Sequence, residues 1–331
     1  MKAFVNANPR DLQHAATLLQ QAHRDGRTAA LAGGGSDVLG MMKDRLITPD
    51  LLVNLKAVKG LDQVAAGNGR SDTVTIGGLI TLDALNRDAT VRRMYPVLAE
   101  AAGSVATPQI RNVATLAGNV CQRPWCWYYR NGFNCFKNGG TTCYSASGEN
   151  QFHAIFGGGP SYIVHPSDTA PALVALDARF RIVGPDGERI VPAAEFFTLP
   201  KENVARENVL KEDEVLAAVL LPPAGRSVRS TYHKIMDREA WTHAVVSAAI
   251  VLDMDRDVCR RARVVLGGVA PIPWRLPEVE GMLAGRTITP ALAAQAGEGA
   301  VAGARPLAKN AYKIPLTRAM VRRTLLALAN A

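Results

Sequence analysis

Apolar residues recur at helical spacing near the start of the chain and then give way to a short strand and a glycine-rich turn. In residues 9–23 this spacing is held by Leu12, Ala15, Ala16, Leu18, Leu19 and Ala22. The pattern predicts an amphipathic helix. The segment TAALAGGGSD follows, a short apolar strand that runs into glycines. A helix, a strand and a glycine turn are therefore expected at the start of the fold.

Short strands and helices continue through the middle of the chain. LLVNL (51–55) and TVTIGG (73–78) predict strands, and TLDALNRD predicts a helix with Thr81 as its N-cap. VRRMYPVLAEAAG predicts the next helix. Further along, we expect a strand at HPSD (165–168), a helix at TAPALVALDA, and strands around RFRIVG and at VLAAVLL.

The prolines and glycine at 222–225 interrupt this pattern and predict a domain boundary. Beyond it, STYHKI, HAVVSAAIVLD and ARVVLGGV predict strands, and helices are expected near 276–284, 289–303 and 315–330. Runs of strands followed by runs of helices are typical of an α+β fold and not of a doubly wound sheet.

The composition and charge of the chain mainly exclude some classes of protein. The chain has 331 residues, is 48% hydrophobic and carries a net charge of +9. The basic residues are scattered, as at 256–263 and 318–323, which indicates a solvated face or a docking surface for an acidic partner and not a nucleic-acid site. The start turns polar by residue 6, without the apolar core of a signal peptide, and no apolar run is long enough to span a membrane.

Two glycine-rich turns carry the first candidate chemistry: LAGGGSDVLGMMK at 31–43 and ATLAGNV at 114–120. Glycine adopts positive φ and lets successive backbone N–H groups converge on a pyrophosphate. Each turn also holds short polar side chains, Ser36 and Asp37 in the first and Thr115 and Asn119 in the second. Neither matches a Rossmann fingerprint or a phosphate-binding loop with its lysine. Together they predict one shared nucleotide, outside a nicotinamide-type Rossmann domain.

Four of the five cysteines, Cys121, Cys126, Cys135 and Cys143, lie in one short loop with the spacing C-x4-C-x8-C-x7-C. Paired C-x2-C knuckles typical of zinc modules are absent, and an odd count without an export signal argues against a disulfide framework. Thiolates in an irregular loop suit an iron–sulfur cluster. Cys259 stands apart beside a predicted strand and is expected to be a small buried residue.

Aromatic residues crowd the same loop, where they would pack it and shield a cluster: Trp125, Trp127, Tyr128, Tyr129, Phe133, Phe136 and Tyr144. No Ser/His/Asp set, paired carboxylates or H-x3-H pattern accompanies them, so catalysis by side-chain proton transfer or nucleophilic attack is not indicated. A flavoprotein that transfers electrons needs no such set, because the flavin carries the chemistry.

A family resemblance rests on PQIRNVATLAGN, with AGGGSDVL before it and HPSD, YHKIMDR and LGGVAPIPWR after it. In this order the chain resembles the FAD-binding subunit of the xanthine dehydrogenase and aldehyde oxidoreductase family of molybdenum hydroxylases, over essentially its whole length. The resemblance implies a two-lobed FAD-binding domain of the vanillyl alcohol oxidase type at 1–223, with lobes at about 1–58 and 59–223. A domain like the C-terminal domain of the carbon monoxide dehydrogenase flavoprotein would follow at 227–331.

The resemblance also implies roles for individual residues. The first turn would wrap the FAD pyrophosphate with Leu31, Ala32, Gly33, Gly34, Gly35, Ser36, Asp37 and Val38. Thr115, Gly118 and Asn119 would complete the cradle. Asp168 would hydrogen-bond the flavin side, Leu216 would pack on its ring, and Lys234 would lie near it. Taken alone, Asp168 could be a helix N-cap and Lys234 a solvated strand residue.

The cysteine loop, at about 120–161, resembles an insertion in a subset of this family that includes 4-hydroxybenzoyl-CoA reductase and periplasmic aldehyde oxidoreductase and carries a [4Fe–4S] cluster. Three of that subset's ligands correspond to Cys126, Cys135 and Cys143. The fourth falls where this chain has Ser161. The fourth ligand is therefore open between Cys121, Ser161 and an exogenous group, and Cys121 could touch the flavin instead.

The function implied is an FAD and iron–sulfur subunit of a heterotrimeric molybdenum hydroxylase that oxidises an aldehyde or N-heterocycle. A large molybdopterin subunit would bind the substrate, a small subunit with two [2Fe–2S] centres would relay electrons, and an external acceptor would receive them. The expected location is cytoplasmic, or periplasmic by export with a partner. Two alternatives stay open: a stand-alone flavin oxidase, and a non-redox scaffold whose loop binds zinc.

Overall fold

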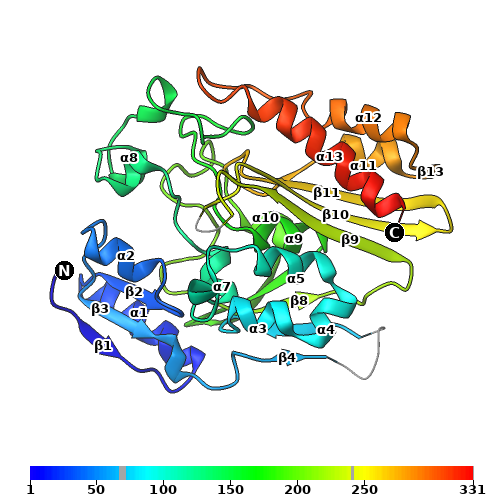
Figure 1. Ribbon diagram of the computed structural model, residues 1–331. Coiled ribbons are helices and arrows are strands. Elements are labelled where there is room, and N and C mark those ends of the chain that lie inside the picture. Colours follow the sequence, from blue (N-terminus) through cyan, green and yellow to red (C-terminus); the bar gives the residue numbers. More distant parts are fainter. Residues whose placement is uncertain (67–71, 240–241, 331) are drawn as a thin grey trace.

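The computed structural model describes residues 1–66, 72–239 and 242–330, and Figure 1 shows their arrangement. Residue 331, the end of the expected C-terminal domain, and residues 67–71 of the expected second lobe lie outside the described part. In the described ranges, no helix combines the length and the apolar character needed to cross a membrane.

The N-terminal lobe is a small parallel sheet with two helices. Its strands are β1 (Val5–Ala7), β2 (Ala29–Ala32) and β3 (Leu51–Asn54), in the order β1-β3-β2. Helix α1 (Leu12–Arg24) begins where Asp11 caps the backbone N–H of His14, and it buries the predicted apolar stripe against the sheet. The glycine turn follows β2 and leads into α2 (Val38–Lys43). The pattern of residues 9–36 therefore predicted this lobe's helix, strand and turn.

The second lobe is an antiparallel sheet covered by short helices. The sheet has the order β4-β5-β8-β6-β7, from β4 (Val64–Ala65), β5 (Val74–Gly77), β6 (Arg179–Gly184), β7 (Gly187–Pro192) and β8 (Val215–Leu221). The helices are α3 (Leu82–Arg87), α4 (Ala89–Met94), α5 (Pro96–Gly103), α6 (Pro108–Arg111), α7 (Leu116–Val120), α9 (Thr169–Ala175) and α10 (Ala193–Phe196). Thr81 caps α3 as expected, since its side chain accepts from the N–H of Ala84.

Two local predictions in this lobe are wrong, and proline explains both. The single helix expected over VRRMYPVLAEAAG is broken between α4 and α5, because Pro96 forces Tyr95 out of helical geometry, with φ −138° and ψ 58°. The strand expected at HPSD is not formed among the described residues 161–167. Pro160 and Pro166 cannot donate to a strand ladder.

The C-terminal part is an antiparallel sheet with helices on one face. The strands are β9 (Val228–Ile235), β10 (Val246–Asp255), β11 (Val258–Gly267), β12 (Trp274–Arg275) and β13 (Arg286–Thr287), and the helices are α11 (Pro277–Leu283), α12 (Pro290–Gly299) and α13 (Lys313–Ala329). Cys259 is fully buried in this core, as expected.

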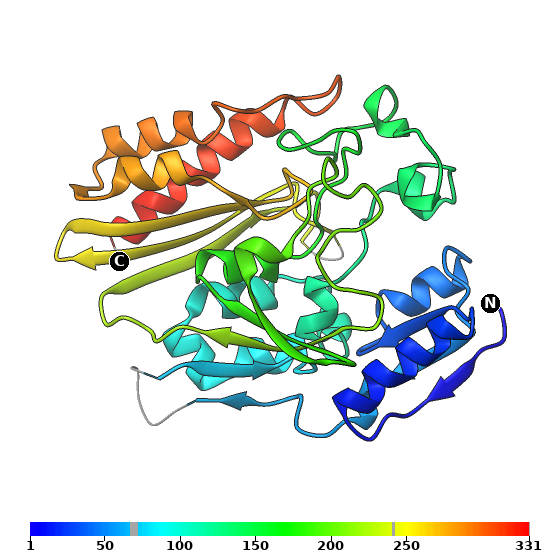
Figure 2. The same cartoon turned by 180° about the vertical axis from the view of Figure 1, so that it is seen from behind.

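The layers meet through helices of the second lobe. One core joins Leu98 of α5 and Leu173 of α9 to Val219 of β8 on one side and to Ala249 and Val265 of the C-terminal sheet on the other. Figure 2 shows these helices between the two sheets, with α11–α13 covering the outer face of the C-terminal sheet. This core joins the second lobe to the C-terminal sheet, and a separate core joins Leu19 and Val53 of the N-terminal lobe to Leu79 and Val215 of the second lobe.

The cysteine loop is long and irregular. Between α7 and α9 it forms only one helical turn, α8 (Trp127–Arg130), and two 3₁₀ turns, η2 (Phe136–Asn138) and η3 (Tyr144–Ala146). In Figure 1 it lies between α2 of the N-terminal lobe and the segment before α13. Loops of this length in compact domains are uncommon unless they serve a function.

Candidate functional site

A cavity of about 750 Å³ opens between the N-terminal lobe and the second lobe. This volume lies within the range of about 300–1,000 Å³ typical of ligand sites. Of the residues predicted to hold FAD, those on its wall are Leu31, Gly33, Gly34, Gly35, Ser36, Asp37, Val38, Thr115, Gly118 and Leu216. The two glycine turns, 80 residues apart in the sequence, therefore face one space.

The glycine turn packs closely on the segment before α7. A Cβ built on Gly34 would lie 1.9 Å from the carbonyl oxygen of Val113 and 2.9 Å from the Cα of Ala114. Gly35 adopts φ +78°, the left-handed region that favours glycine. These two positions bring the backbone of the first turn against the second.

Unpaired backbone donors line the turn. Across residues 33–37, all of which the structure describes, no backbone N–H donates to a protein acceptor. Buried or half-buried backbone donors are nearly always paired, and successive free N–H groups in a turn form an anion-binding concavity. The turn therefore fits the pyrophosphate of a dinucleotide cofactor such as FAD.

The second predicted turn is wrong as a turn, because residues 116–120 form the short helix α7. Thr115 caps this helix, and its Oγ1 accepts from the N–H of Gly118 at 3.2 Å. Asn119 is buried and is not on the wall of the cavity. Its Oδ1 accepts hydrogen bonds of 2.6 Å from both Ser167 Oγ and Thr169 Oγ1. Asn119 thus ties α7 to the start of α9.

Three further predicted residues are also off this wall. Ala32 is buried in a small core with Met42 and Leu52. Asp168 and Lys234 form a buried ion pair with an Oδ2–Nζ distance of 2.7 Å and side-chain exposures of 4% and 3%. The alternative of a solvated Lys234 is wrong. Asp168 does stand at the N-cap position of α9, but its side chain makes no capping hydrogen bond, and Ser167 Oγ accepts from the N–H of Ala170 instead.

Asp168 belongs to a second, smaller cavity of about 240 Å³ between the cysteine loop and the C-terminal sheet. Its Oδ1 accepts from the hydroxyl of Tyr232 at 2.6 Å. Burial, followed by the charge of Asp168, raises the pKa of Tyr232 well above its ordinary value. Trp125, Trp127 and several histidines complete this second cavity. Tyr232 therefore keeps its proton and donates a hydrogen bond that fixes the Asp168 carboxylate.

The structure separates the four clustered cysteines into two groups. Cys126, Cys135 and Cys143 line one small pocket together with Ser161, which is buried. Cys121 instead lines the large cavity beside Gly118. All five cysteines are free thiols. Ser161, and not Cys121, therefore lies in the same pocket as the other three predicted ligands.

Burial raises the pKa of Cys121 to about 12. Burial also raises the pKa of Cys126 to about 11, and the neighbouring Cys143 and Cys135 thiols add to this rise. Groups of three or more His, Cys, Asp or Glu side chains close enough to hold a single metal ion are absent from the described residues. Three sulfur donors and a hydroxyl around one pocket suit iron chemistry, and a bound metal deprotonates such thiols.

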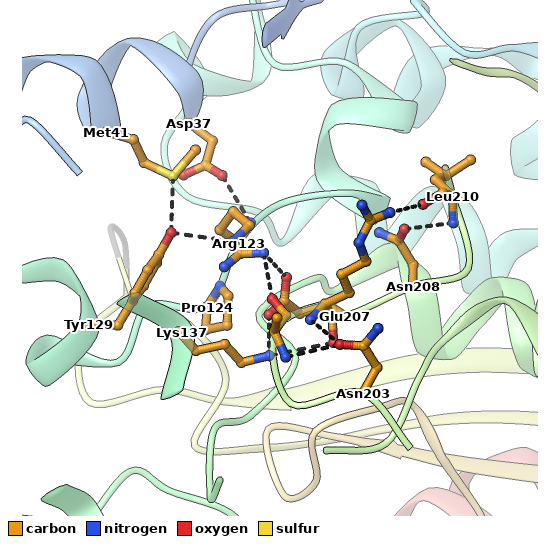
Figure 3. Close-up of polar contacts among 12 residues, drawn as sticks. Asp37, Met41, Arg123, Pro124, Tyr129, Lys137, Asn203, Glu207, Asn208 and Leu210 are labelled. Atoms are coloured by element: carbon orange, nitrogen blue, oxygen red, sulfur yellow. Dashed lines mark hydrogen bonds and ion pairs between the residues drawn. The ribbon is translucent and has the colours of Figure 1, made fainter. Parts of the chain in front are cut away.

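A polar network joins the cysteine loop to the large cavity (Figure 3). Glu207, buried in the loop before β8, lies 2.9 Å from Arg123 Nη1 and 2.5 Å from Lys137 Nζ. Asp37 of the glycine turn accepts from the backbone N–H of Arg123 at 3.0 Å and from Arg130 Nη2 at 2.8 Å. The loop and the glycine turn are thus held as one unit.

Sequence reasoning missed the cationic part of this site. Arg123, Lys137 and Arg206 all line the large cavity. Lys137 could have been suspected, since it lies two residues after Cys135, but Glu207 lies 70 residues further along and has no local signal.

Arg130 is expected to stabilise the contact between the cysteine loop and the glycine turn. Its side chain is 9% exposed, pairs with Asp37, donates to two backbone carbonyls, and lies 4.2 Å from the centre of the Trp125 ring. Because removing one partner leaves a buried charge unpaired, Arg130→Met should lower the free energy of unfolding by about 3 kcal/mol. Urea denaturation measures this. Arg87→Met, which removes an exposed pair with Asp83, should change it by less than about 1 kcal/mol. Equal changes in the free energy of unfolding for the two variants would contradict this stabilising role of Arg130.

Comparison with known proteins identifies the family. Residues 2–224 match the model of the FAD binding domain in molybdopterin dehydrogenase, and residues 231–328 match the CO dehydrogenase flavoprotein C-terminal domain. The chain belongs to this family of molybdopterin dehydrogenase FAD-binding proteins. The family match agrees with a cavity whose glycine turn presents free backbone donors.

Individual relatives span nearly the whole chain. It is 33% identical to the aldehyde oxidoreductase FAD-binding subunit PaoB of Escherichia coli, over 88% of each protein. It is 28% identical to the carbon monoxide dehydrogenase medium chain of Hydrogenophaga pseudoflava, over 96% of this chain and 94% of that one. A solved carbon monoxide dehydrogenase structure from the same organism superimposes with a TM-score of 0.77 at 26% identity, over 98% of this chain and 96% of that chain. The predicted α+β fold with two such domains is confirmed.

Proposed function

We propose that this chain is the FAD and iron–sulfur electron-transfer subunit of a heterotrimeric molybdenum hydroxylase that oxidises an aldehyde or an N-heterocycle. The observation that carries the proposal is the row of free backbone N–H groups at residues 33–37, facing a large cavity next to a pocket of three cysteines. Bound FAD would supply the redox chemistry.

The chain's own residues would hold and orient the cofactor. Backbone donors of Gly33–Asp37 would bind the pyrophosphate, with Thr115 and Gly118 opposite them. Leu216 on β8 presents an apolar surface to the same cavity. Lys234 and Tyr232 hold the Asp168 carboxylate in place next to the neighbouring cavity, where it would accept a hydrogen bond from the flavin side.

A [4Fe–4S] cluster held by Cys126, Cys135 and Cys143 is the second part of the proposal. Ser161 lines the same pocket and would occupy the fourth position, directly or beside an exogenous ligand. Cys121 would then face the flavin. Support comes from the donor set: soft thiolates in an irregular, aromatic-lined loop suit an iron–sulfur cluster.

The partners proposed are a large molybdopterin subunit, a small subunit with two [2Fe–2S] centres and an external electron acceptor. The relatives, a FAD-binding subunit and a medium chain by name, support an assembly of several chains. This chain lacks a sequence pattern for acid–base or nucleophilic catalysis, so substrate oxidation is assigned to the partner.

The deciding experiment is the absorption and EPR spectrum of the purified protein and its copurifying subunits, before and after reduction, with metal analysis. A flavin band that bleaches and a reduced cluster signal in this chain are expected. A colourless chain with one zinc would favour the scaffold alternative, and flavin without iron would remove the cluster from the proposal.

The isolated chain is expected to be inactive toward aldehydes and purines. The reason is that oxidation of the organic substrate is assigned to the molybdopterin subunit. Steady-state turnover with a dye acceptor, compared between the isolated chain and the complex, measures this. Rates near those of the complex would support the stand-alone flavin oxidase.

A further inference from the structure

The wall between the cysteine pocket and the second cavity is formed in part by a histidine that contacts a cysteine sulfur. His153 Nε2 lies 3.3 Å from Cys126 Sγ, within the range of hydrogen bonds to sulfur. Cys126 lines both the cysteine pocket and the second cavity, whereas His153 lines only the latter. His153 is 4% exposed, and its Nδ1 has no hydrogen-bond partner in the protein. The contact is therefore enclosed and solvent-poor.

The C-terminal domain fixes the backbone around this histidine. Asn310 Nδ2 donates to the carbonyl oxygens of His153 and Ala154 at 3.1 and 3.2 Å. The Nζ atom of Lys313, a fully buried residue at the start of α13, donates to the carbonyl oxygen of Phe152 at 3.0 Å. Asn310 is itself fully buried. The buried side chains of Asn310 and Lys313 thus fix the backbone of residues 152–154, which includes His153.

The chemistry of the pair fixes the direction of the hydrogen bond. A cysteine that binds iron is a thiolate, which only accepts hydrogen bonds. The Nε2 atom facing it must then carry the proton, and Nδ1 is left as an acceptor without a partner in the protein. Hydrogen bonds to sulfur spread the negative charge of a cluster and favour its reduced state, so they raise its reduction potential.

We propose that His153 is a positioning residue that donates a hydrogen bond from Nε2 to the Cys126 thiolate and raises the reduction potential of the cluster in this loop. The inference rests on the cluster of the proposed function. It assigns His153 a role outside the ligand set, because His153 lines the second cavity and not the pocket that Cys135, Cys143 and Ser161 share.

The test compares His153→Leu with His153→Gln in the full chain purified with its copurifying subunits. Leucine removes the donor, whereas the glutamine side chain keeps an N–H of similar reach. Iron and FAD contents and an EPR-monitored redox titration are measured. At the potential where half of the wild-type cluster is reduced, the ratio of reduced to oxidised cluster in His153→Leu should fall about tenfold, a shift of about 59 mV for one electron. His153→Gln should stay near the wild type.

His165→Leu is the matched control, since His165 is a buried histidine of the same cavity whose Nδ1 accepts from the N–H of Ser167. Its cluster potential should not change. An unchanged potential in an iron-replete His153→Leu would overturn this inference and leave the proposed function standing. Loss of iron from both His153 variants with FAD retained would make His153 a ligand and also overturn it. A wild-type protein without a cluster signal would remove the proposed function first.

Discussion

Gly34→Ala is expected to lose at least 90% of its FAD affinity, a change of about 1.4 kcal/mol or more in binding. The new methyl group would lie 1.9 Å from the carbonyl oxygen of Val113 and 2.7 Å from its carbon. Both neighbours are backbone atoms that cannot rotate away, so the glycine turn and its free N–H groups must shift from their place on the cavity wall. FAD content per chain, from the absorbance of the purified protein and from titration of the apoprotein, measures the effect.

Gly40→Ala is the matched control for this change. Gly40 lies in α2, only six residues away, and a Cβ there meets nothing within 4 Å. Alanine also favours a helix over glycine by about 1 kcal/mol, so stability should not fall. Full FAD occupancy in Gly34→Ala, equal to that of Gly40→Ala, would mean that the turn does not bind the cofactor.

Serine substitutions at Cys126, Cys135 and Cys143 are each expected to strip the iron or convert the cluster. The three sulfurs line one pocket, and serine is a harder and poorer ligand for iron than thiolate. Cys121→Ser should keep the iron and perturb mainly the flavin spectrum, because Cys121 lines the large cavity. Iron analysis with absorption and EPR spectra distinguishes these outcomes.

Ser161 gives the complementary experiment. Ser161→Cys places a fourth sulfur in the pocket and should keep the cluster while altering its potential. Cys259→Ser, in the core of β11, serves as a control for cysteine loss without loss of iron. Loss of iron from Cys121→Ser at the same level as from Cys135→Ser would restore Cys121 to the ligand set. Less than one iron per chain, with zinc in its place, would end the cluster hypothesis.

Local signals in the sequence were sufficient wherever one segment decides its own structure. The apolar spacing of residues 9–23 predicted α1, and Thr81 marked the start of α3. AGGGSD predicted a glycine turn, whereas TLAGN, which was also predicted as a turn, forms the short helix α7. Residues of both segments line one cavity. Pro96 was a local signal too, but the apolar spacing across it suggested a continuous helix, whereas the missing N–H of proline ended α4.

Contacts between distant segments decided the rest of the site. Asn119 looked like a cofactor ligand beside its glycine, yet its oxygen is used by Ser167 and Thr169. Lys234 could be a solvated residue of β9 when taken alone, yet it shares the strand face of buried Ser230 and Tyr232, and its charge is paired with that of Asp168. A single carboxylate, Glu207, joins Arg123 and Lys137 across a span that no motif covers.

The sequence by itself determined the family, the two-domain α+β class, the glycine turns and the cysteine loop, because each follows from residue types at short spacing. Only the tertiary structure decided which cysteines share a pocket. Cys121 is five residues from Cys126, but it follows α7 and lines the large cavity. Ser161, 40 residues after Cys121, lies beside the other three cysteines. Spacing in a sequence limits how far apart two side chains can be. The packing of the N-terminal lobe, the second lobe and the C-terminal domain decides which cavity each side chain faces.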